Sequence, residues 1–286
     1  MPGFRNVREY TEAQRFGRFS SCSLRKVPSQ ASTAGRWVDL SMAAGNPVPN
    51  YYASSPLVAA TLDGFRGVFH GDAKVGQEKY LTEWMLVTPT AGLVGRYMLL
   101  DYLIYYPFVD LDDADAQVMD NTVTLPRYTD GAGVRAMLVA AAPTTGNGTF
   151  TFDYINQDGV ARTSVLNRCA TTATAIATLL TTEPATAAAN GPFLRLADGD
   201  TGIQQITGWT NSVLNGGLGT VVLVKPLADL PIREINTPSE ITFVERNPIQ
   251  PRIYDGAYLN MIMNCAATVA AGQLAGRLNF AWTSGE

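Results

Sequence analysis

Short runs in which apolar and polar residues alternate, separated by turn-forming residues, make up most of the chain from about residue 35 onward. The clearest run is 148–154, where Phe150, Phe152 and Tyr154 alternate with polar residues. Because neighbouring side chains of a strand point to opposite faces, these three rings share one face. Gly, Pro, Asn and Asp recur between such runs, as in all-β proteins. We therefore predict an all-β fold, a β-sandwich or jelly roll, and leave open whether there are one or two sandwiches.

The same criteria predict about eleven strands. They cover residues 36–41, 67–70, 81–87, 96–106, 134–141, 148–154, 193–196, 219–224, 240–245, 258–264 and 276–282. After Asn156 to Gly159 the chain should turn back as a hairpin at residues 160–162. The run 219–224 is almost continuously apolar, which suits a strand that is buried on both faces.

Helix signals are sparse. Residues Arg5 to Phe19 form an amphipathic pattern, and residues 114–119 allow one short turn of helix. The Ala/Thr-rich stretch 170–190 has a local helical spacing, but its threonines and Pro184 weaken that interpretation.

The pattern divides the chain into four parts. These are a basic N-terminal arm at 1–34, extended or helical, a β-sandwich domain at 35–168, an Ala/Thr-rich connector at 169–190, and a second β unit or the completion of the first sandwich at 191–286.

Charge is scarce and unevenly distributed. Only 16% of the 286 residues are charged, against about a quarter in an average protein, and the net charge is −4. A negatively charged protein is repelled by nucleic acids and anionic membranes, so we expect neither of them as a partner. A surface poor in charge and rich in small residues indicates contacts between subunits, and we expect a homo-oligomer.

Residues 1–30 carry six basic side chains against two acidic ones, which leaves the rest of the chain eight charges negative. Arginines can steer a partner protein by charge, and aromatic rings can anchor it, so this composition predicts a partner interface. Its candidate residues are Phe4, Arg5, Arg8, Tyr10, Arg15, Phe16, Arg18 and Phe19. We expect this arm to be loosely ordered alone, and its deletion over 1–30 to leave a folded body. A frayed, solvated terminus is the alternative.

His70 is the only histidine, and Asp72 follows two residues later. A histidine with an orienting carboxylate can act as a general base, but no Gly-x-Ser-x-Gly elbow supplies a nucleophile. An ordinary turn histidine is the favoured interpretation. One histidine and three scattered cysteines exclude the zinc signatures, and Cys22, Cys169 and Cys265 are expected to be reduced thiols.

The densest charge in the chain is an acidic run of Asp110, Asp112, Asp113 and Asp115. Calcium prefers several carboxylate oxygens, but the spacing does not fit an EF-hand. A solvated loop or a helix start is favoured, with ion binding left open. The run could also meet the basic arm of a neighbouring subunit.

Gly216, Gly217 and Gly219 lack the remaining glycine of a dinucleotide fingerprint, so we expect a hairpin turn. No positively charged leader with an apolar core opens the chain, and no apolar run is long enough to span a bilayer, so we expect synthesis in a cytosol. We predict no catalytic, cofactor-binding or metal-binding residues, no cofactor, and no enzymatic activity.

Two runs, Gly35 to Tyr52 and Asp120 to Gly131, resemble a group of tailed-bacteriophage virion proteins. The resemblance continues through Asp101 to Pro107 and into the strand at Phe150, so it covers roughly residues 30–165. It implies a virion component made in the host cytoplasm.

Within that resemblance, we first expect a capsid decoration (cement) protein. It would bind the head lattice as a homo-oligomer, with a trimer as the guess. Its partners would be copies of itself and the major capsid protein or other virion proteins. A tail, baseplate or fibre-attachment protein is the alternative. From another class, a glycan-binding or glycan-degrading module would use Trp209, Tyr51 or Tyr128 for stacking, and the acidic run for hydrolysis.

Overall fold

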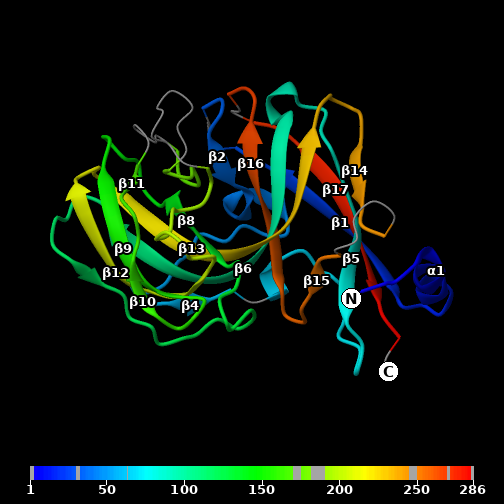
Figure 1. Cartoon of the computed structure of the whole chain (residues 1–286). Helices are drawn as coiled ribbons and strands as arrows, with labels where there is room; N and C mark the ends of the chain where they lie inside the picture. The colour runs from blue at the N-terminus through cyan, green and yellow to red at the C-terminus, as the bar shows by residue number, and fades with distance from the viewer. Residues whose placement is uncertain are drawn as a thin grey trace.

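The computed structural model describes residues 3–29, 33–62, 64–169, 175–181, 191–244, 250–268 and 271–284. These residues form three antiparallel β-sheets, one α-helix and three short 3-10 turns (Figure 1). The prediction of an all-β fold is confirmed.

A central sheet contains the two longest strands. Its order is β2 (Trp37–Asp39), β16 (Tyr258–Cys265), β6 (Gly95–Asp110), β13 (Leu218–Ile232) and β8 (Arg135–Ala140), with β4 (Ala60–Thr61) paired to β6.

The other two sheets lie at opposite ends of the view, with the central sheet between them (Figure 1). The arm-side sheet has the order β14 (Ser239–Thr242), β5 (Lys79–Val87), β17 (Leu274–Trp282), β1 (Phe19–Val27) and β3 (Ala44–Asn46), with β15 (Arg252–Ile253) on β5. The distal sheet has the order β10 (Ala161–Thr163), β9 (Thr149–Asn156), β12 (Ile203–Val213) and β7 (Gln117–Val118), with β11 (Asn167–Arg168) on β9.

The central sheet packs against the other two sheets through two separate hydrophobic cores. One half of β6, including Tyr106 and Val109, packs against Phe152 and Trp209 of the distal sheet. The other half, including Leu99, packs against the arm-side sheet. Two sandwich-like packings therefore share β6 and β13, as face-to-face sheet packing allows.

This topology differs from the predicted division of the chain. Strands from the ranges 35–168 and 191–286 both contribute to all three sheets. The predicted arm, 1–34, contains β1, which pairs with β17 near the other end of the chain. Local sequence patterns mark where strands begin and end, but not which distant strand each one pairs with.

A short segment, 177–180, closes the central sheet into a ring. On one side the amide of Ala177 donates to the carbonyl oxygen of Ala140 in β8, at 3.0 Å. On the other side the amide of Asp39 in β2 donates to the carbonyl oxygen of Ala177, at 2.8 Å. The ring encloses a third core. This segment is the described middle of the predicted connector and is not helical; the rest of 170–190 lies outside the described residues.

Some of the predicted strands and helices are present in the structure, and others are not. The three rings of β9 share a buried face, as predicted. Residues 67–70 and 193–196 form no strand, and 114–119 form no helix. Strands β1 and β12 were missed, because Lys26 occupies a buried position in β1 and three register shifts interrupt the alternation of β12.

The predicted N-terminal helix is present but shorter, as α1 (Val7–Arg15). It begins at Asn6, whose side chain accepts a hydrogen bond from the amide of Glu9 at 3.0 Å, a standard N-cap. Phe16 is its C-cap, and Gly17 follows with a φ of +68°, which suits glycine. Ala13 is fully buried, and the helix packs beside β17.

Gly216 and Gly217 both have positive φ, +67° and +80°, and connect β12 to β13. They form the predicted turn. None of the helices among the described residues is long and apolar enough to cross a membrane. Cys22 and Cys169 are buried, unpaired thiols, while the side chain of Cys265 lies outside the description.

Candidate partner-binding surface

The eight predicted interface residues do not share one face of the arm. Phe4 and Tyr10 turn toward the body, with ring centroids 5.8 Å apart, and Phe4 also packs 6.3 Å from Tyr80. The main chain of Phe4 is held at both its amide and its carbonyl by the side chain of Gln250. These two rings hold α1 against the arm-side sheet and are not displayed to a partner.

Charge on the N-terminal half of α1 is partly neutralised within the helix. Arg8 pairs with Glu12 at 3.1 Å. Glu9 accepts a hydrogen bond from the main-chain amide of Arg5, which lies before the helix. Phe19 belongs to β1 and is half-buried. The arm is therefore a docked helix with its own ion pair, and not a loose basic segment.

A basic–aromatic patch remains exposed at the C-terminal end of α1. Phe16 is 67% exposed, and the guanidinium carbons of Arg15 and Arg18 lie 5.8 and 5.9 Å from its ring centroid. The neighbouring loop contributes Lys74, whose Nζ donates to the carbonyl of Gly17. Val75 follows Lys74 and is fully exposed. We define the basic–aromatic patch as Arg15, Phe16, Arg18, Lys74 and Val75.

The acidic run forms a loop that lies beside exposed apolar residues. The amide of Asp112 donates to Asp110 and that of Asp115 to Asp113, each at 2.9 Å, so the loop folds on itself in two short turns. The side chain of Asn211 donates to the carbonyls of Asp110 and Asp113, which holds the loop on the end of β12. The favoured solvated loop is present, and the helix start is absent.

Directly beyond Asn211, Val213 and Leu214 are 53% and 43% exposed, and Val118, which follows the loop in β7, is 76% exposed. We define the acidic–apolar patch as Asp110, Asp112, Asp113, Asp115, Val118, Val213 and Leu214. Among the described residues no group of three acidic, histidine or cysteine side chains is arranged to hold a metal ion.

His70 is a buried structural histidine rather than part of a catalytic pair. Nζ of Lys79 donates to its Nδ1 at 2.9 Å, so Nε2 carries the proton and donates to the carbonyl of Ala257 at 3.1 Å. Lys79 also donates to Gly71 and Asp255. Burial, together with the positive charge of Lys79, lowers the pKa of His70 to about 4. Both ring nitrogens are therefore occupied by hydrogen bonds within the protein.

This lowered pKa predicts a pH-dependent stability. The unfolded chain binds a proton on His70 below about pH 6.5 while the folded chain does not until about pH 4, so stability falls as the pH falls through that window. The slope should be about 1.4 kcal/mol per pH unit, and about 2 kcal/mol between pH 6.5 and 5. Urea unfolding of the wild type and of His70→Gln should show this loss only in the wild type. An equal loss in both would contradict the assignment.

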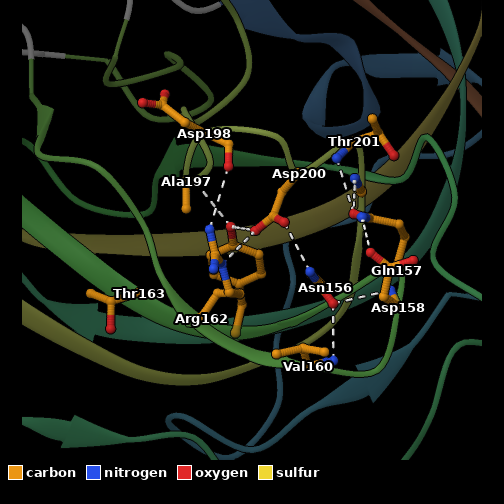
Figure 2. Close-up of polar contacts among 12 residues, drawn as sticks. Asn156, Gln157, Asp158, Val160, Arg162, Thr163, Ala197, Asp198, Asp200 and Thr201 are labelled. Carbon is orange, nitrogen blue, oxygen red and sulfur yellow. Dashed lines mark hydrogen bonds and ion pairs between the residues drawn. The ribbon is translucent and has the colours of Figure 1, made fainter.

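A second polar cluster, which the sequence did not indicate, centres on Asp200 (Figure 2). Its carboxylate accepts from Tyr154, from Asn156 at 2.8 Å and from Arg162 at 3.4 Å. Burial acts to raise the pKa of Asp200, but these donors outweigh it and lower the pKa. Gln157 in turn accepts from the amide of Thr201. The cluster ties the loop before β12 to the β9–β10 hairpin, and its acceptors are already satisfied.

A buried acid lies at the wall of the closed ring. Asp39 accepts from the hydroxyls of Ser41 at 2.7 Å, Tyr102 at 2.7 Å and Tyr52. Burial raises the pKa of Asp39, although these hydrogen bonds oppose the shift. Nearby Lys26 is also buried, donates to two backbone carbonyls, and has its pKa lowered by burial to about 8. These groups bond to each other and to the backbone, as buried polar groups in a core do.

A buried ion pair joins β6 to the loop after residue 125. Arg127 binds Asp101 through two hydrogen bonds, at 2.9 and 2.7 Å, and both side chains are less than a tenth exposed. Arg127 also donates to the carbonyl of Tyr102, and Asp101 accepts the amide of Tyr258 at 3.0 Å. This pair was not predicted, because the two residues are 26 positions apart in sequence.

The three aromatic residues considered for glycan stacking differ in how far they are buried. Trp209 is 1% exposed and stacks on Phe150 at a centroid distance of 4.0 Å, so it belongs to the core. Tyr128 packs edge-to-face on Tyr254 at 4.9 Å. Tyr51 alone of the three is well exposed, at 58%. Of the three candidate rings, Trp209 and Tyr128 are already used in packing, and Tyr51 remains available for stacking.

Comparison with known proteins gives no family. No protein-family model matches the chain, and no curated protein matches it. Among solved structures, it is similar to the T=1 particles derived from infectious bursal virus, with a TM-score of 0.19, 9% identity, and coverage of 93% of this chain and 78% of that chain. The VP2 subviral particle of infectious bursal disease virus gives a TM-score of 0.15, 9% identity, and coverage of 94% and 82%. Similarities this weak support no inference about the function of the chain.

Proposed function

We propose that the chain is a non-enzymatic structural protein of a tailed-bacteriophage virion, a capsid decoration protein that binds the head lattice as a homo-oligomer. The sequence resemblance over roughly residues 30–165 supports the phage assignment. The all-β fold and the low charge are compatible with it, because exposed small and apolar residues favour subunit contacts.

The basic–aromatic patch is the single observation that carries the proposal. An exposed phenylalanine with two guanidinium groups 5.8 and 5.9 Å from its ring centroid has the composition of interface hot spots, in which aromatic and arginine side chains predominate. Among the described residues neither Arg15 nor Arg18 forms an ion pair. Arg15 is exposed and its charge is available to a partner, whereas Arg18 is half-buried, with its Nε enclosed. Because α1 is held by Phe4 and Tyr10, the patch is presented in a fixed orientation.

The copy number in purified particles tests this function. Quantitative mass spectrometry should find the protein on the order of hundreds of copies per virion, as expected for a lattice-bound protein. A few copies, set by the symmetry of the tail, would assign it to the tail, baseplate or fibre attachment instead. Its absence from particles, together with depolymerisation of a bacterial glycan by the purified protein, would overturn the proposal in favour of the glycan-degrading class.

A variant links the patch to this role. Phe16→Ala should reduce incorporation into particles by about tenfold or more, since truncating a hot-spot aromatic costs upward of 1–2 kcal/mol. Tyr51→Ala is the matched control, because Tyr51 is a similarly exposed ring outside both patches. Equal incorporation of the two variants would contradict a role for Phe16.

A further inference from the structure

We infer that the basic–aromatic patch of one copy binds the acidic–apolar patch of a second copy, so that copies associate head to tail. This deepens the proposed function, on whose homo-oligomer it rests, by naming the partner surface of the arm.

The two patches have complementary charge. Arg15, Arg18 and Lys74 give the first a positive surface, and four aspartates give the second a negative one. Among the described residues, neither the two arginines and the lysine nor the four aspartates take part in an ion pair. Opposite unneutralised charges steer association and set the register of two surfaces.

Both patches also display apolar side chains beside these charges. Phe16 and Val75 are 67% and 103% exposed in the first patch. In the second, Val213 and Leu214 are 53% and 43% exposed at the end of β12, and Val118, which pairs with Gly208 earlier in β12, is 76% exposed. Such side chains gain free energy when they are removed from water, and a charged rim around an apolar centre is the usual anatomy of an interface. Charge alone would orient the two copies, and the apolar contact would hold them together.

The two patches cannot meet within one chain. Helix α1, which carries the first patch, lies at one extreme of the molecule in Figure 1, whereas β12 and its neighbours, which hold the second, lie at the opposite extreme. The acidic loop is fixed to β12 through Asn211, and α1 is fixed to the arm-side sheet. Contact between the patches therefore requires a second copy. Because the surfaces differ, the contact is heterologous and builds a closed ring or an open filament.

Sedimentation velocity of the purified full chain, with two variants, tests this inference. Arg15→Glu with Phe16→Ala alters the first patch, and Asp112→Lys with Asp115→Lys alters the second. All four side chains are exposed, and none of the four accepts or donates a side-chain hydrogen bond among the described contacts. Each variant alone should self-associate at least about tenfold more weakly than the wild type, and association of the wild type should weaken as salt rises.

Mixing the two variants gives the decisive result. Each retains one unaltered patch, so a one-to-one complex should form in the mixture at concentrations at which neither variant associates measurably alone. Asp158→Lys with Asp198→Lys is the matched control, because it makes the same charge change on exposed aspartates outside the patch and should associate as the wild type does.

Three results would overturn the inference: a wild type that stays monomeric, variants that associate as the wild type does, or a mixture that fails to associate. If Phe16→Ala nevertheless abolished incorporation into particles, the proposed function would stand without this contact. Head-to-tail association of a protein that is absent from particles would support the inference and refute the proposed function.

Discussion

A chain that lacks residues 1–30 will not fold, whereas a chain that lacks residues 1–16 will keep its three sheets. Strand β1 lies between β17 and β3, and its residues Phe19 to Lys26 pair continuously with β17. Its removal takes Leu24 out of the core, leaves one edge of β17 unpaired and deprives β3 of its partner. The shorter deletion removes only α1 and its contacts on the surface of the sheet.

Circular dichroism and thermal unfolding of the two truncated proteins check this result. The 1–16 deletion should give a cooperative transition and a β-type spectrum, and the 1–30 deletion should give neither. A cooperative transition in the longer deletion would show that the arm-side sheet forms without β1. The expectation that residues 1–30 form a loosely ordered arm is wrong for residues 19–27, because they pair with β17 as β1.

Replacing Asp101 by Asn will lower the free energy of unfolding by about 3–5 kcal/mol, because it leaves the guanidinium of Arg127 buried without a counter-charge. The exposed pair of Arg96 and Asp229 offers a matched control with the same residue types. Asp229→Asn should cost only about 0–1 kcal/mol, since solvent screens an exposed pair and ordering its side chains costs entropy.

Urea unfolding of the two variants measures the difference. A third protein, Asp101→Leu with Arg127→Met, removes both charges and should recover part of the loss. It will not recover all of it, because the amide of Tyr258 loses its acceptor. Equal costs for Asp101→Asn and Asp229→Asn would show that the buried pair contributes no more than a surface pair.

The sequence predicted those elements whose alternation or apolar run is uninterrupted. Strands β9, β6 and β13 lie close to their predicted positions because their buried faces repeat regularly. Strand β1 was missed because its inward positions include Lys26, which the fold satisfies with carbonyls more than fifteen residues away. The closing of the ring by 177–180 depends on two strands far apart in sequence, and nothing local encodes it.

The candidate surface was predicted only in part. The excess of arginine and aromatic residues identified the arm, and Arg15 and Phe16 are exposed, with the half-buried Arg18 beside the ring of Phe16. The sequence did not indicate that Phe4 and Tyr10 face inward, because that follows from how α1 packs on β5 and β17. The other residues of the two patches are also brought into place by tertiary structure. They include Lys74 and Val75 in the loop before β5, and Val213 and Leu214 at the end of β12.

The pairing of β1 with β17 sets the order in which the protein can fold during synthesis. When residues 19–27 leave the ribosome, their partner at 274–282 has not been made, so the arm-side sheet cannot form until nearly the whole chain has been translated. The distal sheet, whose strands lie between residues 117 and 213, can assemble much earlier. Until then β1 displays Cys22 and Leu24 to solvent as an unpaired strand, the state most prone to misassembly with other nascent copies. Production at high translation rate should therefore depend on chaperones that hold the N-terminal strand until synthesis is complete.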